Sequence, residues 1–194
     1  ASDVYKRQEI VGVPTSLATE KLALEVGIPL VDLSEIDGLD IVIDGADEYD
    51  PQFQLIKGGG AALLREKIVA QESSGMVVVA DDRKRVDTLG AFPLPIEVTP
   101  FSHEATVRAL SRLLDCRVNI RMAGDGPVFT DNGNMIADAH TGPNIDDPIS
   151  TEANILLIAG VVQVGLFNNM CDAVVLAGSN GVETVINPNG RLQE

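Results

Sequence analysis

The sequence contains little cysteine, and what it has follows no motif. Cys116 and Cys171 are the only two in 194 residues, and they form neither a CxxC pair nor an evenly spaced framework. Such usage is typical of a cytosolic protein with free thiols, and free cysteine is among the most buried residue types. We therefore expect two small buried hydrophobes. A Cys–His nucleophile is the alternative, but His103 and His140 lie in no recognisable catalytic context.

Long apolar runs and basic stretches are also lacking. The best apolar run, residues 155–162, falls far short of the ~18 residues that a membrane helix needs. The N-terminus shows no apolar signal region. The densest basic stretch, residues 81–85, is diluted by its own aspartates. These absences argue against a membrane protein and against nucleic acid as a partner.

Acidic and apolar residues are what the chain has in quantity. Its 29 acidic and 14 basic side chains give a net charge of −15, and 45 % of its residues are apolar. The apolar share favours a packed globule over a disordered acidic tail, and the length suits one or two domains. The negative charge disfavours association with nucleic acid or anionic lipid.

The first eight residues differ in character from the rest of the chain. Residues 1–8 are polar and unpatterned, and an apolar segment that predicts a strand begins abruptly after them. We expect a foreign or disordered leader here. An ordinary frayed terminus is the alternative.

The next part of the chain alternates strands and helices. The pattern predicts helices at 17–26, ending at Gly27, and at 61–73, and strands at 10–13, 28–32, 39–44 and 76–80. Apolar strands separated by helices indicate a parallel sheet that is covered on both faces. We therefore expect an α/β, Rossmann-like domain.

The pattern changes after the proline-rich residues 92–95. We expect strands at 96–99, 117–122, 128–130, 135–139 and 161–166, and helices at 102–114, with Ser102 as N-cap, and at 150–158. The Asn132-Gly133 pair predicts a hairpin. The order β-α-β-β-α-β describes a smaller ferredoxin-like α+β module. A last strand at 173–176 returns to the first sheet. The predicted domains are residues 9–93 with 167–194, and residues 94–166.

Carboxylates gather where one apolar strand ends. Asp44, Asp47 and Glu48 follow the strand directly, and Gly45 allows a sharp turn or a close approach to a ligand. Ligands bind at this carboxyl edge in open α/β sheets. Three interpretations are open: acid–base work on a sugar, a Mg²⁺ site, or a solvated acidic loop.

A glycine run precedes the helix expected at 61–73. Gly58, Gly59 and Gly60 leave their N–H groups unobstructed, which suits an anion or an oxyanion, and Lys57 adds a positive charge. Glu66 lies within the first two turns, close enough to project back toward the loop. Its alternative role is that of an exposed helix carboxylate between basic neighbours. Together, the two segments favour proton transfer next to a carbonyl.

These motifs closely resemble those of ribose-5-phosphate isomerase, type A. The resemblance rests on residues 44–48 (Asp-Gly-Ala-Asp-Glu), 57–63 (Lys-Gly-Gly-Gly-Ala-Ala-Leu) and 65–67 (Arg-Glu-Lys). It continues through residues 79–84, 92–95, 130–134 and 160–167 and covers nearly all of residues 10–185. It implies an isomerase/CoA-transferase-like fold.

The resemblance also implies an activity and its residues. The family interconverts ribose 5-phosphate and ribulose 5-phosphate through an enediolate, in the non-oxidative pentose phosphate pathway and without metal or cofactor. Glu66 matches the base that moves the proton between C1 and C2, and Asp44 and Lys57 match the other catalytic positions. The matching binding positions are Asp44, Gly45, Ala46, Asp47, Lys57, Gly58, Gly59, Gly60 and Lys84.

The sequence departs from the family at one place. The family's leading βα unit, with a Gly-Thr-Gly-Ser-Thr phosphate turn, has no counterpart here, so we expect an incomplete gene product. The alternative functions are a non-catalytic sugar-phosphate-binding module or an inactive fragment. A Mg²⁺-dependent phosphatase is disfavoured because Ala46 stands where its second aspartate would be. The expected partner is a small sugar phosphate, and the family implies a cytoplasmic homodimer or homotetramer.

Overall fold

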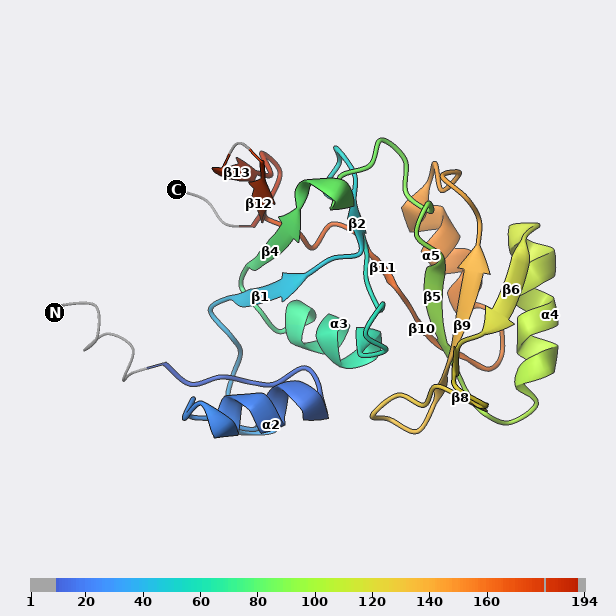
Figure 1. The fold of residues 1–194 in the computed structure, drawn as a ribbon, viewed down its shortest axis with the longest axis horizontal. Coiled ribbons are helices and arrows are strands. Elements are labelled where there is room, and N and C mark those ends of the chain that lie inside the picture. The colour runs from blue at the N-terminus through green and yellow to red at the C-terminus, as the bar shows by residue number, and fades with distance from the viewer. Residues whose placement is uncertain (1–9, 180, 192–194) are drawn as a thin grey trace, which may run out of the picture.

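The computed structural model of the chain describes residues 10–179 and 181–191. The leader expected at residues 1–8 lies outside the described residues. The described chain is an α/β structure with two four-stranded sheets and two smaller ones. Figure 1 shows the two larger sheets on opposite sides of the molecule.

The first sheet has the strand order β1-β4-β12-β13. Its strands are β1 (Val42–Gly45), β4 (Met76–Asp81), β12 (Ala173–Gly178) and β13 (Gly181–Ile186). The first three are parallel, and β13 pairs antiparallel with β12. The expected return of residues 173–176 to this sheet is confirmed. The carboxyl ends of β1 and β4 lie side by side, which places Asp44 at the edge where ligands bind in such sheets.

Two helices and two short 3₁₀ turns accompany this sheet. They are α2 (Leu17–Glu25), η2 (Leu33–Glu35), α3 (Leu63–Gln71) and η3 (Asp82–Lys84). The Ser16 hydroxyl caps α2 by accepting from the Thr19 N–H at 3.0 Å, and Gly27 follows its end with a φ of 77°. Val69 and Ala70 of α3 pack into a core with Val42, Met76 and Val78 of the sheet.

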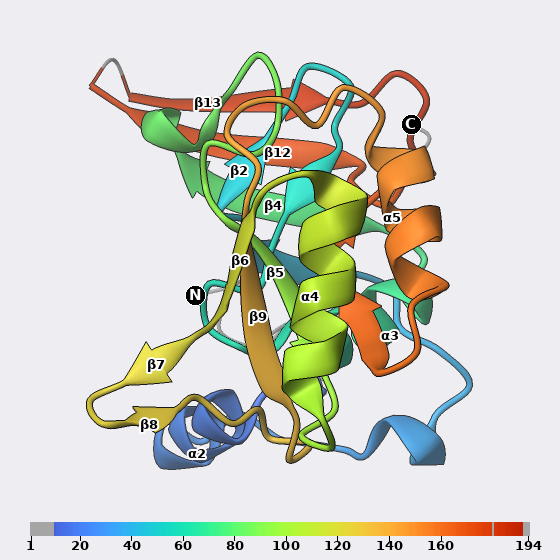
Figure 2. The ribbon, with the colours of Figure 1, turned by 90° about the vertical axis from the view of Figure 1, so that its right-hand side faces the viewer.

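The second sheet is antiparallel with the order β10-β5-β9-β6. Its elements are β5 (Leu94–Val98), α4 (His103–Leu114), β6 (Arg117–Ile120), β9 (Met135–His140), α5 (Pro148–Leu156) and β10 (Val161–Val164). This β-α-β-β-α-β sequence follows the expected pattern. Helices α4 and α5 cover the face that points away from the first sheet (Figure 2), and a separate core lies between them and the strands.

A small sheet lies between the two larger ones. It consists of β2 (Glu48–Tyr49), β3 (Leu55–Ile56) and β11 (Leu166–Phe167). A two-stranded ribbon of β7 (Met122–Ala123) and β8 (Gly126–Pro127) extends from the second sheet. Because β11 follows β10 after Gly165 alone, the predicted strand 161–166 is divided in two.

Several local predictions are wrong. Residues 10–13 and 28–32 form only one isolated parallel bridge, between Gly12 and Leu30. Ile10, Val11 and Ile28 are exposed, so this pair lacks the burial that stabilises parallel strands. Residues 128–130 likewise contribute only a bridge from Phe129 to Met135, although the Asn132-Gly133 turn forms as expected.

Two further differences concern backbone conformation and pairing. Ser102 is the N-cap residue of α4, as predicted, but it has a left-handed φ of 49° and makes no side-chain cap hydrogen bond. Strands β2, β3, β8 and β13 have no counterpart among the predicted strands.

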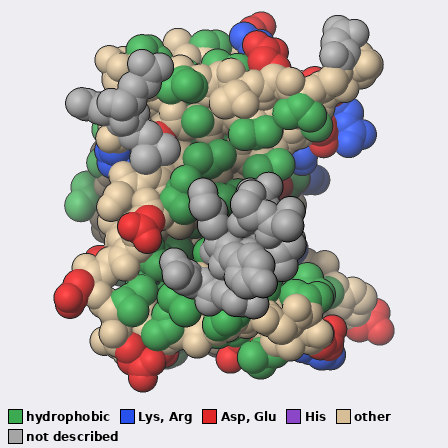
Figure 3. Space-filling view, turned by 90° about the vertical axis from the view of Figure 1, so that its left-hand side faces the viewer, with side chains coloured by type: hydrophobic (Ala, Val, Ile, Leu, Met, Phe, Trp, Pro, Cys, Tyr) green, Lys and Arg blue, Asp and Glu red, His purple; other side chains and the backbone are tan. Residues whose placement is uncertain are grey.

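Exposed apolar side chains mark the edge of the first sheet. Leu22, Leu24 and Val26 near α2 and Ile41 and Ile43 at β1 are all more than two-fifths exposed. Figure 3 shows apolar side chains gathered on the corresponding face. Within the described residues, no helix is long and apolar enough to cross a membrane.

Candidate active site

The site begins at the carboxyl end of β1. The Asp44 carboxylate accepts the Gly45 N–H at 2.7 Å through Oδ1, which fixes the side chain at the turn out of the strand. Its Oδ2 lies 3.0 Å from the Lys57 ammonium. The strand end and the glycine segment are therefore joined through one ion pair, as the sequence predicted they would be close.

The glycine segment wraps around Asp47. The Asp47 carboxylate accepts the Gly59 N–H at 2.7 Å, and a Cβ at Gly59 would lie 2.5 Å from Asp47 Oδ1. Gly58 has a φ of 108°, a conformation that side chains with a Cβ rarely adopt. Glycine is therefore required at both positions for this loop to approach the carboxylate.

Lys57 is the buried cation of the site. Its side chain is 3 % exposed, and its ammonium donates to the Gly45 carbonyl at 2.5 Å. It also lies 3.3 Å from Glu66 Oε2 and 5.4 Å from the centre of the Phe167 ring. Lys57 thus contacts Asp44 and Glu66, the two carboxylates that match catalytic positions of the family.

Glu66 projects from the first turn of α3 toward Lys57. Burial raises the pKa of its carboxyl, Lys57 opposes this rise, and Asp44 adds to it. A raised pKa brings the carboxyl closer to the range in which it can both accept and release a proton. Glu66 Oε2 and Asp44 Oδ2 are buried and have no aligned hydrogen-bond donor among the described residues. Both oxygens can therefore accept from a bound hydroxyl.

A cavity of about 180 Å³ unites these groups. It is lined by Asp44, Gly45, Ala46, Asp47, Lys57, Gly58, Gly59, Gly60 and Glu66. These are all of the predicted site residues except Lys84. Lys84 ends η3, which follows β4 at the same sheet edge, but its side chain does not line this cavity.

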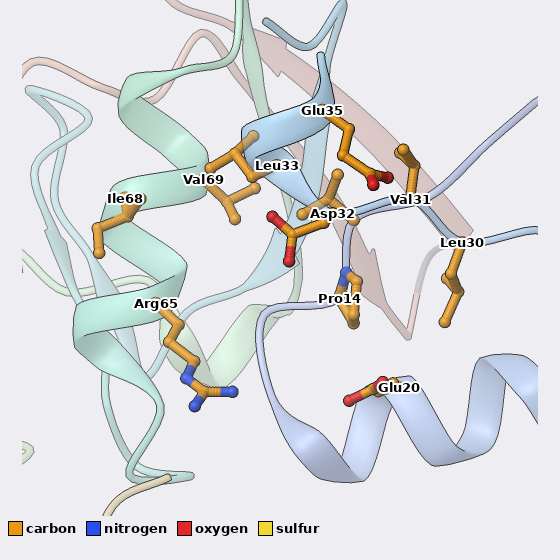
Figure 4. Close-up of a pocket in the computed structure, with 11 residues that line it drawn as sticks. Pro14, Glu20, Leu30, Val31, Asp32, Leu33, Glu35, Arg65, Ile68 and Val69 are labelled. Carbon is orange, nitrogen blue, oxygen red and sulfur yellow. The ribbon is translucent and has the colours of Figure 1, made fainter. Parts of the chain in front are cut away.

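A larger cavity, of about 440 Å³, lies elsewhere, between α2, η2 and α3. Figure 4 shows the carboxylates of Glu20 and Asp32 and the guanidinium of Arg65 pointing into it. Glu35 makes a third carboxylate, and Arg65 is already bound to Asn132 Oδ1 and the Asp131 carbonyl, both at 3.0 Å. This acidic cavity suits an anionic ligand poorly, and Arg65 does not supply charge to the smaller one.

Sequence reasoning missed several groups around the site. Lys67 is as buried as Lys57, and its ammonium lies 5.0 Å from the centre of the same Phe167 ring. It binds Glu152 Oε1 at 2.5 Å, Gln163 Oε1 at 2.9 Å and the carbonyls of Val164 and Leu166 at 2.8 and 2.7 Å. These partners lie 85 to 99 residues away, so no local pattern could reveal them.

Arg121 is the second missed group. Its guanidinium binds Asp138 through two hydrogen bonds of 2.8 and 2.6 Å and donates to the carbonyls of Gly58 and Gly59.

Glu48, which follows the same strand as Asp44, has a structural role. Its side chain is buried and accepts hydrogen bonds from the Gly90 and Phe92 N–H groups.

The two cysteines and a possible metal site were the remaining candidates for reactive groups. Burial raises the pKa of the Cys171 thiol to about 12 and also raises that of Cys116, so neither thiol is activated. In the part of the chain that the structure describes, no group of three or more His, Cys, Asp or Glu side chains could hold a metal ion.

Comparisons with known proteins agree on one family. A family model described as ribose 5-phosphate isomerase A (phosphoriboisomerase A) matches residues 11–181. A curated relative from Sinorhizobium medicae, named ribose-5-phosphate isomerase A, is 49 % identical over 191 residues, which cover 95 % of this chain and 82 % of the relative.

Solved structures lead to the same family. Ribose 5-phosphate isomerase from Plasmodium falciparum is 36 % identical with a TM-score of 0.89, over 93 % of this chain and 79 % of that one. A D-ribose-5-phosphate isomerase in complex with phospho-erythronic acid is 43 % identical with a TM-score of 0.88, over 95 % and 82 % of the two chains.

Proposed function

The chain belongs to the ribose 5-phosphate isomerase A family, and from that premise we propose that Glu66, Asp44 and Lys57 carry out its reaction. The enzyme is an aldose–ketose isomerase that interconverts D-ribose 5-phosphate and D-ribulose 5-phosphate. The observation that carries the residue assignment is the Lys57 ammonium, which lies 3.0 Å from Asp44 and 3.3 Å from Glu66 in one cavity.

Glu66 acts as the base. Its carboxylate removes the C2 proton of the open-chain aldose, the C–H electron pair forms the C1–C2 double bond, and negative charge develops on O1. The same carboxyl then returns the proton to C1, which completes the ketose. A pKa raised by burial supports this double role, because the group must give back the proton it has taken.

Lys57 and Asp44 act on the O1 and O2 oxygens of the substrate. The buried ammonium polarises the substrate carbonyl and stabilises the enediolate, since a positive charge in a site with little water acts strongly on developing negative charge. Asp44 moves the hydroxyl proton between O2 and O1 and assists ring opening. Its Oδ2, which lacks an aligned donor among the described residues, supports this assignment.

The remaining cavity residues bind the substrate. We assign this role to Gly45, Ala46, Asp47, Gly58, Gly59 and Gly60, and to Lys84 at the same sheet edge. The phospho-erythronic acid found in one related structure is a carboxylic acid that carries a phosphate group. We propose that it also binds in the cavity of this chain. With a net charge of −15, the protein must attract a dianionic substrate through local positive groups, chiefly Lys57, Lys84 and the glycine N–H dipoles.

We extend the proposal to organisation and location. Residues 9–93 with 167–194 form a Rossmann-like domain, and residues 94–166 form a ferredoxin-like one. The 4-1-3-2 arrangement of the four strands in the second unit supports this division. Family membership supports a cytoplasmic homodimer or homotetramer.

Formation of ribulose 5-phosphate from ribose 5-phosphate tests the proposal. Glu66→Gln should lower kcat by about 10³-fold, within the range for loss of a general base. Glu72→Gln, at the exposed C-terminal end of the same helix, is the matched control and should retain activity. An unmodified protein without activity would contradict the function, and an unaffected Glu66→Gln variant would contradict the assignment.

A further inference from the structure

Arg121 connects the second sheet to the glycine segment of the first. It follows β6, and Asp138, its partner, lies on the face of β9 opposite the core, since the flanking Ala137 and Ala139 pack toward the helices. The two side chains are 17 % and 18 % exposed and form a two-point ion pair. The remaining guanidinium nitrogen, Nη1, donates to the Gly58 carbonyl at 2.8 Å and the Gly59 carbonyl at 2.9 Å.

Those two hydrogen bonds determine which way the glycine peptides face. The described chain contains no cis peptide bond, and in a trans peptide the C=O and the following N–H point in opposite directions. With the Gly58 carbonyl on Arg121, the Gly59 N–H points to the other side, where it meets Asp47. Asp47 lines the cavity, so the side away from Arg121 is the cavity side.

The next peptide has the same geometry. The Gly59 carbonyl also binds Arg121, which turns the Gly60 N–H away from the guanidinium. Gly60 lines the cavity with Lys57 and Glu66, and its N–H has no hydrogen-bond partner among the described residues. An N–H held in this way is a donor for an oxygen that becomes negative during reaction.

We propose that Arg121, held by Asp138, is a positioning residue that fixes the glycine segment so that the Gly60 N–H faces the enediolate oxygen. The inference rests on the proposed function. Arg121 acts through the backbone and does not touch the substrate. A lysine could not replace it, because one ammonium cannot bind both Asp138 oxygens and both carbonyls in a planar fork.

Substitution with steady-state kinetics tests the inference. Arg121→Gln should lower kcat and kcat/KM equally, by about 100-fold, with KM unchanged, as for loss of a donor that acts in the transition state. Arg121→Lys and Asp138→Asn should each lower kcat by about tenfold, a partial loss of the same effect. Phospho-erythronic acid carries a carboxylate, whose negative oxygens resemble those of the enediolate, so its affinity, measured by calorimetry, should decrease with kcat/KM.

The matched control is Arg117→Gln. Arg117 is an exposed arginine on β6, and its substitution should leave kcat within twofold of the unmodified enzyme.

The acid limb of the pH profile should stay in place in the Arg121 variants, because Arg121 is not among the groups that perturb the pKa of Glu66. A general loosening of the site would move that limb and raise KM, and would overturn the positioning role.

Urea unfolding separates stability from positioning. If Arg121→Gln does not fold, Arg121→Lys and Asp138→Asn decide the question. Folded Arg121 variants with kcat within twofold of the unmodified enzyme would overturn this inference alone. An unmodified enzyme without isomerase activity would overturn the proposed function, and this inference with it.

Discussion

Lys57 and Lys67 are two buried lysines beside one aromatic ring, and their environments differ in one respect. Both are 3 % exposed, and their ammonium groups lie 5.4 and 5.0 Å from the centre of the Phe167 ring. Lys67 has four oxygen partners within 2.9 Å and does not line the cavity of the site. Lys57 donates to one carbonyl, lies between two carboxylates, and lines that cavity.

The two environments show what separates a catalytic cation from a structural one here. Burial and charge are the same, so neither identifies the reactive lysine. Lys67 is saturated by fixed partners from α5, β10 and β11, which leaves it nothing to offer a ligand. Lys57 lies next to two carboxylate oxygens that lack aligned donors in the described chain, and it opens to a cavity. Carboxylate oxygens that can still accept a hydrogen bond at a cavity are therefore the informative feature.

The largest expected effect is the loss of activity in Lys57→Met. We expect kcat to fall by about 10³-fold, since a preorganised group that stabilises the enediolate is lost. The fold should be retained, because Glu66, whose pKa burial already raises, can take up a proton once the cation is gone. Steady-state kinetics and circular dichroism measure the two outcomes. Lys21→Met, at an exposed lysine of α2, is the control.

The second effect concerns stability in Lys67→Met. Removing the ammonium leaves Glu152 Oε1 and two backbone carbonyls without their donor, so the free energy of unfolding should fall by about 3 kcal/mol. The kcat of the folded variant should change less than tenfold. Urea unfolding and kinetics on the folded protein measure both. If Lys67→Met abolished kcat as Lys57→Met does, the distinction between the two lysines would fail.

The smallest effect is a shift of the pH profile, measured on the residual activity of Asp44→Asn. Burial raises the pKa of Glu66, so the base form, and with it kcat/KM, is lost as the pH falls through that raised value. Asp44 contributes to the rise, and its neutralisation should move the acid limb to lower pH. Lys57 opposes the rise, so Lys57→Met should move the limb to higher pH. An acid limb unchanged in both variants would contradict the electrostatic coupling.

The raised pKa of Glu66 also makes the stability of the fold depend on pH. A carboxyl whose pKa is raised on folding binds protons more tightly in the folded state, so its contribution is largest at low pH and is lost as pH rises through the folded pKa. Glu66 therefore weakens the fold near neutral pH, which is consistent with a group placed for reaction.

The core of the site could be predicted from the sequence because it is local. Asp44, Lys57 and Glu66 lie within 23 residues, and an apolar strand, a glycine run and a helix start place them at one sheet edge. Arg121 lies 62 residues or more from the carbonyls it binds, and such contacts leave no mark on the neighbouring sequence. Lys84 was assigned to the site only because it matches a binding position of the family, and it does not line the cavity.

The fold was predictable wherever periodicity coincided with burial. Strands β4 and β9 and helix α4 follow apolar patterns that the structure buries. Residues 10–13 carry the same pattern but form only a bridge, because strand formation depends on partners that a pattern does not supply. Ser102 shows the limit for caps, since a left-handed backbone removes the bond that its residue type favours.

Exchange of the transferred proton with solvent tests the central assignment most directly. In deuterium oxide, the unmodified enzyme should incorporate deuterium at C2 of ribose 5-phosphate and C1 of ribulose 5-phosphate, as followed by proton NMR. Glu72→Gln should do so at the same rate, and Glu66→Gln should leave both positions protonated over the same period. Incorporation by Glu66→Gln at the unmodified rate would show that another group moves the proton.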